Sequence, residues 1–91
     1  MTRLANKIAI ITGAAQGQGA AIARAFVGEG ARVVIADIAD EAGKLLADEL
    51  GDAAAFVHHD VSQKESWTAL VEACEQTFGA PNVLVNNAGL L

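Results

Sequence analysis

The residues best suited to bind an anion form a glycine-rich turn, Thr12-Gly13-Ala14-Ala15-Gln16-Gly17-Gln18-Gly19. The turn follows the apolar run of residues 8–11 and precedes an alanine-rich stretch with helical periodicity. Glycine has no Cβ, so Gly13 permits a sharp turn, and Gly17 and Gly19 let backbone N–H groups approach a ligand closely. Unpaired N–H groups and the helix dipole both favour negative charge at a helix N-terminus. The turn therefore predicts a phosphate site.

One acidic residue, Asp37, ends the second apolar run at residues 32–36. It follows the glycines by roughly the 20 positions at which a dinucleotide-binding unit places a ribose-binding acid. Its carboxylate would accept hydrogen bonds from an adenosine ribose and repel a 2′-phosphate. Ala15, Gln16 and Ile38 supply no cation for such a phosphate. NAD is therefore favoured over NADP; the alternative is a solvated or helix-capping aspartate.

The rest of the chain alternates apolar, β-branched runs with stretches of helical periodicity. These patterns predict strands at about residues 7–12, 32–36, 53–58 and 83–85, and helices at about residues 18–29, 40–50 and 62–78. Ser62 and Glu65 have capping-box spacing at the start of the third helix, and residues 83–85 are expected to form a buried strand. The alternation predicts one domain, residues 1–91, with a doubly wound parallel sheet of order 3-2-1-4.

Composition excludes several classes of function. The net charge of −5, with only six basic residues, gives no electrostatic footprint for nucleic acid or an anionic membrane. Hydrophobic residues make up 53% of the chain and no apolar run approaches the roughly 20 residues that cross a bilayer, so we expect a soluble, cytoplasmic protein. The lone Cys74 is expected to be buried and inert. His58 and His59 should point to opposite faces of a strand, which argues against a metal pair.

Taken together, the motifs resemble those of one enzyme family. Thr12-Gly13-xxx-Gly17-x-Gly19, Asp37, Asp60-Val61 and Asn86-Asn87-Ala88-Gly89, in this order and spacing, look like the N-terminal half of a short-chain dehydrogenase/reductase. The resemblance covers essentially the whole chain and implies a Rossmann-like sheet that binds NAD. Gln18 departs from the family pattern, which commonly has an apolar residue between the last two glycines.

The resemblance also implies a role for each part of the site. The glycine turn would line the pyrophosphate and the adjoining ribose, Asp37 would hold the adenosine ribose, Asp60 and Val61 the adenine edge, and the Asn-Asn-Ala-Gly segment the nicotinamide half. Asn86 and Asn87 could instead be chiefly structural, because side-chain amides at a strand end can tie neighbouring strands together. The candidate cofactor-binding residues are Gly13, Gln16, Gly17, Gln18, Gly19, Asp37, Ile38, Asp60, Val61, Asn87, Ala88 and Gly89.

The family's catalytic group is missing from these residues. Members use a Tyr followed four positions later by a Lys, helped by a Ser and an Asn, whereas this chain has no Tyr. Its two serines, Ser62 and Ser66, begin a helix remote from the expected nicotinamide end. We therefore expect the cofactor-binding half of an NAD-dependent alcohol or ketone oxidoreductase, with its catalytic and substrate segments beyond Leu91. The alternatives are a free-standing dinucleotide-binding module, or a partner-completing or homo-oligomerising fragment with an open strand edge at residues 83–85.

Overall fold

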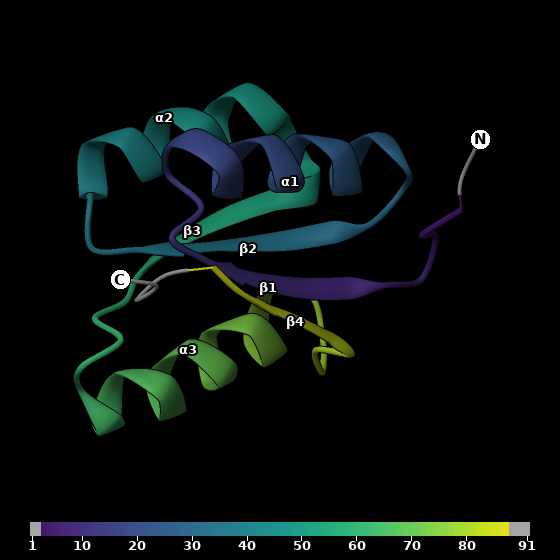
Figure 1. Cartoon of the computed structure of the whole chain (residues 1–91). Coiled ribbons are helices and arrows are strands. Elements are labelled where there is room, and N and C mark those ends of the chain that lie inside the picture. Colours follow the sequence, from purple (N-terminus) through teal and green to yellow (C-terminus); the bar gives the residue numbers. More distant parts are fainter. Residues whose placement is uncertain (1–2, 88–91) are drawn as a thin grey trace.

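The computed structural model describes residues 3–87, which alternate strand and helix as the sequence predicts (Figure 1). The elements are β1 (Ile8–Thr12), α1 (Gly17–Gly28), β2 (Arg32–Asp37), α2 (Asp40–Leu50), the 3₁₀ turn η1 (Gly51–Ala53), β3 (Ala54–His58), α3 (Lys64–Thr77) and β4 (Val83–Asn86). None of the helices within residues 3–87 is long and apolar enough to cross a membrane.

The four strands form one parallel sheet in the order β3-β2-β1-β4, which confirms the predicted topology. The register places Thr12, the last residue of β1, beside Ala36 of β2 and Asn86 of β4. Three carboxyl-terminal strand ends therefore meet where the chain turns into α1. In a doubly wound sheet this is the edge at which ligands bind.

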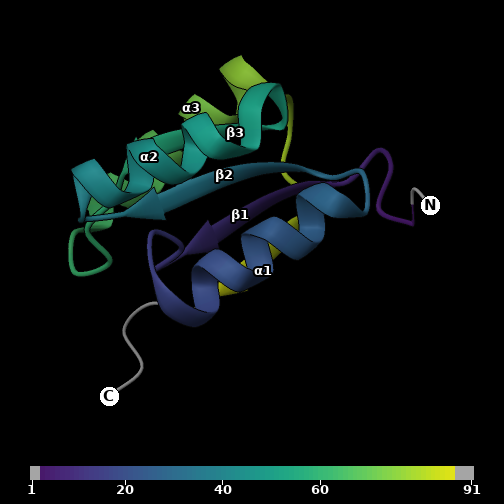
Figure 2. The ribbon, with the colours of Figure 1, turned by 90° about the horizontal axis from the view of Figure 1, so that it is seen from above.

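Helices cover both faces of the sheet. Helices α1 and α2 lie on one face and α3 on the other (Figure 1), with α1 over β1 and β4 and α2 over β3 (Figure 2). Alternate residues of the strands feed two cores, because successive side chains point to opposite faces. Ala9, Ile11, Val33 and Ile35 pack under α1 and α2. Ile10, Val34 and Ala36 pack against Leu70 and Cys74 of α3.

Strand β4 is less buried than predicted. Leu84 at its centre is 58% exposed, whereas β1 and β2 are buried over most of their length. The prediction of a fourth buried strand was wrong, because β4 pairs only with β1 and α3 does not reach across its face. A mostly apolar cavity of about 270 Å³ lies there instead, lined by Ile10, Trp67, Val71, Pro81, Asn82, Val83 and Leu84.

Candidate functional site

The glycine-rich turn connects β1 to α1, and the backbone N–H groups in the first turn of α1 have no acceptor within the helix. Gly13 and Gly17 adopt positive φ angles of 63° and 59°, a region that glycine enters without steric cost. No side chain caps α1, its first turn holds no acidic residue, and Ala20 donates to the carbonyl of Gln16 over 3.3 Å. The N–H groups that precede Ala20 have no intrahelical acceptor. This arrangement suits an anion.

Open space adjoins the turn at Gly17 and none remains at Gly19. A Cβ built on Gly17 would meet no atom within 4 Å. A Cβ on Gly19 would overlap the carbonyl oxygen of Gly13 and lie 2.8 Å from Nδ2 of Asn87. Gly19 therefore lets α1 pack directly on the turn, while Gly17 leaves its N-terminus accessible.

The end of β4 is tied to the turn by side-chain hydrogen bonds. The backbone N of Asn87 donates to Thr12 Oγ1 over 3.0 Å, and Asn87 Nδ2 donates to the Gly13 carbonyl over 3.2 Å. Thr12 Oγ1 in turn donates to Oδ1 of Asn86 over 3.2 Å. Both asparagines thus have partners within the fold, which fits the structural role, and the contact of Asn87 with a cofactor stays a prediction. Ala88 and Gly89 lie outside the described residues.

Asp37 makes a contact that sequence reasoning missed. Its Oδ2 accepts a hydrogen bond of 3.0 Å from the backbone N of Ala15, and its Oδ1 accepts one of 2.9 Å from the backbone N of Ala39. The bond to Ala39 is the local turn that an Asp favours two residues ahead. The bond to Ala15 spans 22 residues and has no sequence signal. The carboxylate at the end of β2 therefore holds the glycine-rich turn in place.

Asp60 lies beyond β3 in a tight turn of its own. Oδ1 of Asp60 accepts from both the backbone N and the hydroxyl of Ser62, over 3.0 and 2.7 Å, and these bonds lower the pKa of the carboxyl group. The predicted capping box was wrong, because the Ser62 hydroxyl is used here and α3 begins at Lys64 without a side-chain cap. Two apolar side chains next to the site acids are exposed, Ile38 at 61% and Val61 at 38%.

An acidic cavity of about 480 Å³ lies beside the turn, at the start of α2. It is lined by Gln16, Ala39, Asp40, Glu41, Ala42 and Leu45. Two carboxylates and no lysine or arginine thus face the space next to Asp37. Asp40 also contacts Nδ1 of His58 at 2.6 Å.

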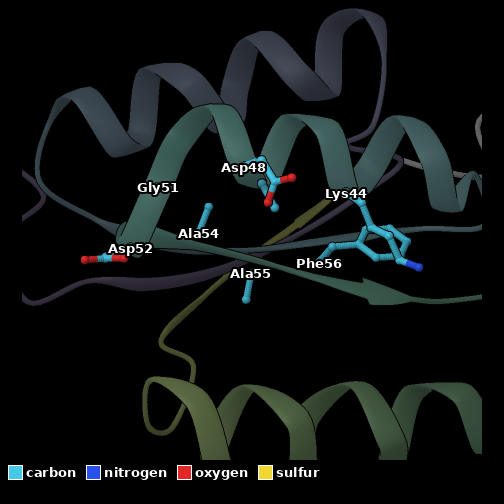
Figure 3. Close-up of a pocket in the computed structure, with 8 residues that line it drawn as sticks. Lys44, Asp48, Gly51, Asp52, Ala54, Ala55 and Phe56 are labelled. Atoms are coloured by element: carbon cyan, nitrogen blue, oxygen red, sulfur yellow. The ribbon is translucent and has the colours of Figure 1, made fainter.

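A second cavity, of about 450 Å³, lies between α2 and β3 (Figure 3). Lys44, Asp48 and Asp52 supply its charged groups, and Phe56 forms an apolar wall. Buried Gly43 lets the Phe56 ring lie directly on α2, since a Cβ there would overlap the ring. The cavity extends to the amino-terminal side of β3, at η1, away from the strand ends that form the candidate site.

The two neighbouring histidines point apart, as strand alternation predicts. His58 is exposed and pairs with Asp40, whereas His59 is buried against Trp67. Cys74 is buried as expected, and burial raises the pKa of its thiol. Within residues 3–87 the structure contains no group of three or more His, Cys, Asp or Glu side chains placed to hold a metal ion.

Comparison with known proteins identifies the class of protein that this fold and turn define. Residues 7–91 match the family described as short chain dehydrogenase, and the chain belongs to the short-chain dehydrogenase/reductase family. This confirms the resemblance drawn from the motifs.

Particular relatives are similar over almost the whole chain. It is 54% identical over 89 residues to "3-alpha-(or 20-beta)-hydroxysteroid dehydrogenase" of Mycobacterium tuberculosis, covering 98% of this chain and 34% of that protein. It is 44% identical to "NADP-dependent (R)-specific alcohol dehydrogenase" of Lentilactobacillus kefiri, covering 97% of this chain and 36% of the relative.

A solved structure of the family has a closely similar fold. The crystal structure of 3-ketoacyl-(acyl-carrier-protein) reductase from Brucella melitensis complexed with NADH superposes with a TM-score of 0.87 at 41% identity, over 89% of this chain and 34% of that one. The chain thus spans about a third of the length of the relatives that it matches.

Proposed function

We propose that this chain is the NAD-binding part of a short-chain oxidoreductase that transfers hydride between NAD(H) and the CH–OH or C=O group of an alcohol or ketone. The observation that carries the proposal is the uncapped N-terminus of α1, which opens beside Gly17 while Asp37 holds the preceding turn through Ala15. A phosphate fits both the free N–H groups and the space that a Cβ would fill. NAD supplies the hydride acceptor, and the chain supplies its position.

Each part of the site would hold one part of the dinucleotide. The backbone of Gly13, Gly17, Gln18 and Gly19, with Gln16, would bind the pyrophosphate and the adjoining ribose. Asp37 still has free lone pairs after accepting two N–H groups, so it can take the adenosine ribose hydroxyls, with Ile38 beside it. Asp60 and Val61 would flank the adenine, and Asn87, Ala88 and Gly89 would lie under the nicotinamide half.

The preference for NAD rests on charge. A 2′-phosphate beside the Asp37 ribose would lie near a cavity whose charged groups are Asp40 and Glu41, and carboxylates repel it. The relatives include an NADP-dependent dehydrogenase as well as a reductase bound to NADH, so they do not decide between the two cofactors. The proposed preference for NAD therefore rests on this chain's own residues. We propose NAD as the cofactor on this ground.

Chemistry beyond positioning would come from residues outside these 91. The chain has no Tyr to act as the proton donor, so it is expected to be inactive alone. Leu84 is exposed and an apolar cavity lies beside it, next to α3. These features favour contact of this face of β4 with further polypeptide. A second copy of the chain would make that contact a homo-oligomer.

The proposal is tested by titrating the chain with NAD while following heat release and thermal unfolding. At a hundred times the dissociation constant, NAD should stabilise the folded chain by about 2.7 kcal/mol. No binding and no melting shift at millimolar NAD would refute a competent site. Sequencing the DNA downstream of Leu91 tests the rest, because a Tyr-x-x-x-Lys motif in the same reading frame is expected.

A further inference from the structure

A chain of hydrogen bonds joins α3 to the loop that follows β3. The backbone N of Asp60 donates to Oγ of Ser66 over 3.1 Å, and the same Oγ lies 3.0 Å from Nδ1 of His59. Ser66 lies in the first turn of α3 and is partly buried. The first turn of the helix thus uses a side chain to hold the Asp60 backbone.

His59, which contacts the Ser66 hydroxyl, is itself held in place by burial and packing. It is only 2% exposed, and its ring packs edge-on against Trp67 with centroids 4.4 Å apart. Its backbone N donates to the carbonyl of Asp37 over 3.0 Å, so one residue joins the loop of Asp60 to the loop of Asp37. Burial lowers the pKa of His59 and so favours its neutral ring.

Core packing alone does not account for a histidine at this position. Its Nε2 is buried with no hydrogen-bond partner, and such a group costs free energy that a Leu or Phe would avoid. What a histidine provides and an apolar residue does not is Nδ1, which meets Ser66. The Ser66 hydroxyl thus links the His59 ring to the Asp60 backbone, and the His59 backbone N binds the Asp37 carbonyl.

We propose that Ser66, oriented by His59, is a positioning residue for the adenosine end of the dinucleotide site. The inference rests on the proposed function, because it assigns Asp60 and Val61 to the adenine. By fixing the N–H of Asp60, Ser66 sets where the following Val61 is presented. Helix α3, which carries no residue assigned to the cofactor, thereby acts on cofactor binding.

The test compares Ser66→Ala, Ser66→Thr and the control Thr68→Ala, an exposed position on the same helix. Loss of one hydrogen bond predicts about three- to tenfold weaker binding of NAD and of AMP to Ser66→Ala. Inorganic pyrophosphate, which lacks adenosine, should bind all variants within about twofold of the parent chain. Ser66→Thr keeps the hydroxyl and should restore NAD and AMP binding, and Thr68→Ala should match the parent.

Amide hydrogen exchange without ligand separates the inference from the proposed function. Ser66→Ala should speed exchange at the Asp60 N–H and leave the β1 amides protected. Unchanged exchange at Asp60, or NAD binding to Ser66→Ala within twofold of a parent chain that binds NAD, would overturn the positioning role. Failure of the parent chain to bind NAD at all would instead overturn the proposed function, whatever the exchange data give.

Discussion

Asp37 Oδ2 accepts a hydrogen bond of 3.0 Å from the backbone N of Ala15, so the acid that ends β2 fixes the turn that ends β1. The same carboxylate binds the N–H of Ala39 through its other oxygen. The residue expected to bind the adenosine ribose therefore also shapes the glycine-rich turn. Removing Asp37 is therefore expected to affect both NAD binding and the structure of the glycine-rich turn.

Asp37→Ala should weaken both NAD binding and stability. The change leaves the part-buried N–H of Ala15 without its acceptor, which costs up to about 1–3 kcal/mol, and it removes the proposed ribose contact. Asp37→Asn keeps an oxygen for one of the two N–H groups, so its loss of stability should be smaller. Calorimetric NAD titration and urea unfolding measure the two effects. An Asp37→Ala chain that binds NAD as tightly as the parent would contradict the assignment.

Two glycines of α1 should respond oppositely to the same substitution. Gly19→Ala places a methyl group against the Gly13 carbonyl and should destabilise the chain by about 1–3 kcal/mol while weakening NAD binding. Gly28→Ala meets no atom within 4 Å and should be neutral or stabilising by up to about 1 kcal/mol. Urea unfolding of both variants checks the pair, and equal losses would mean that α1 does not pack on the turn.

Much of the architecture could be predicted from the sequence because it depends on local pattern. The apolar runs of β1 and β2 are buried on both faces of the sheet. Such strands appear in the sequence as continuous apolar runs, which are recognisable without knowing the fold. The glycine spacing and Asp37 likewise located the turn and the strand end. The strand order 3-2-1-4 then followed from the doubly wound architecture that alternating strands and helices predict.

Contacts that depend on the exact three-dimensional path of the chain could not be predicted. The bond of Ala15 to Asp37 requires the three-dimensional path of the turn, and that of Ser66 to Asp60 requires the place where α3 begins. The capping-box pattern at Ser62 was misleading because Asp60 competes for the same hydroxyl. The exposure of Leu84 depends on where α3 lies across the sheet, which no local pattern encodes.

The parent chain should bind NAD at least about tenfold more tightly than NADP, because Asp37 and the cavity acids Asp40 and Glu41 carry negative charge near the proposed adenosine ribose site. Ala39→Arg adds a cation to the acidic cavity at the start of α2 without removing Asp37. It should reduce the ratio of NAD affinity to NADP affinity by about fivefold. Ala39→Gln is the uncharged control and should leave it unchanged. Competition titrations at low and high salt measure the ratio, and equal effects of Arg and Gln would exclude charge as the cause.

Leu84→Ser should reduce any self-association of the chain. Leu84 is exposed on β4, an edge strand that pairs only with β1, and lies beside an apolar cavity, so it can contact a second copy at small cost to the monomer. Leu45→Ser is a matched control, since Leu45 is 70% exposed on α2 across the sheet. Sedimentation over a range of concentrations is the measurement. A parent chain that stays monomeric throughout would rule out the homo-oligomer.

Acidification should destabilise the chain through His59. Desolvation lowers the pKa of this buried histidine below its ordinary value of 6.5, outweighing the opposing effects of Ser66 and the Asp60 charge. Below about pH 6.5 the unfolded chain therefore binds a proton that the folded chain does not, so the stability present above this pH is lost as the pH falls toward the folded pKa. The free energy of unfolding, measured in urea from about pH 7.5 to about pH 5.5, should fall accordingly. His59→Gln should flatten this dependence while His58→Gln, at the exposed neighbouring position, should retain it. If His59→Gln keeps the full slope, protonation of other groups destabilises the fold.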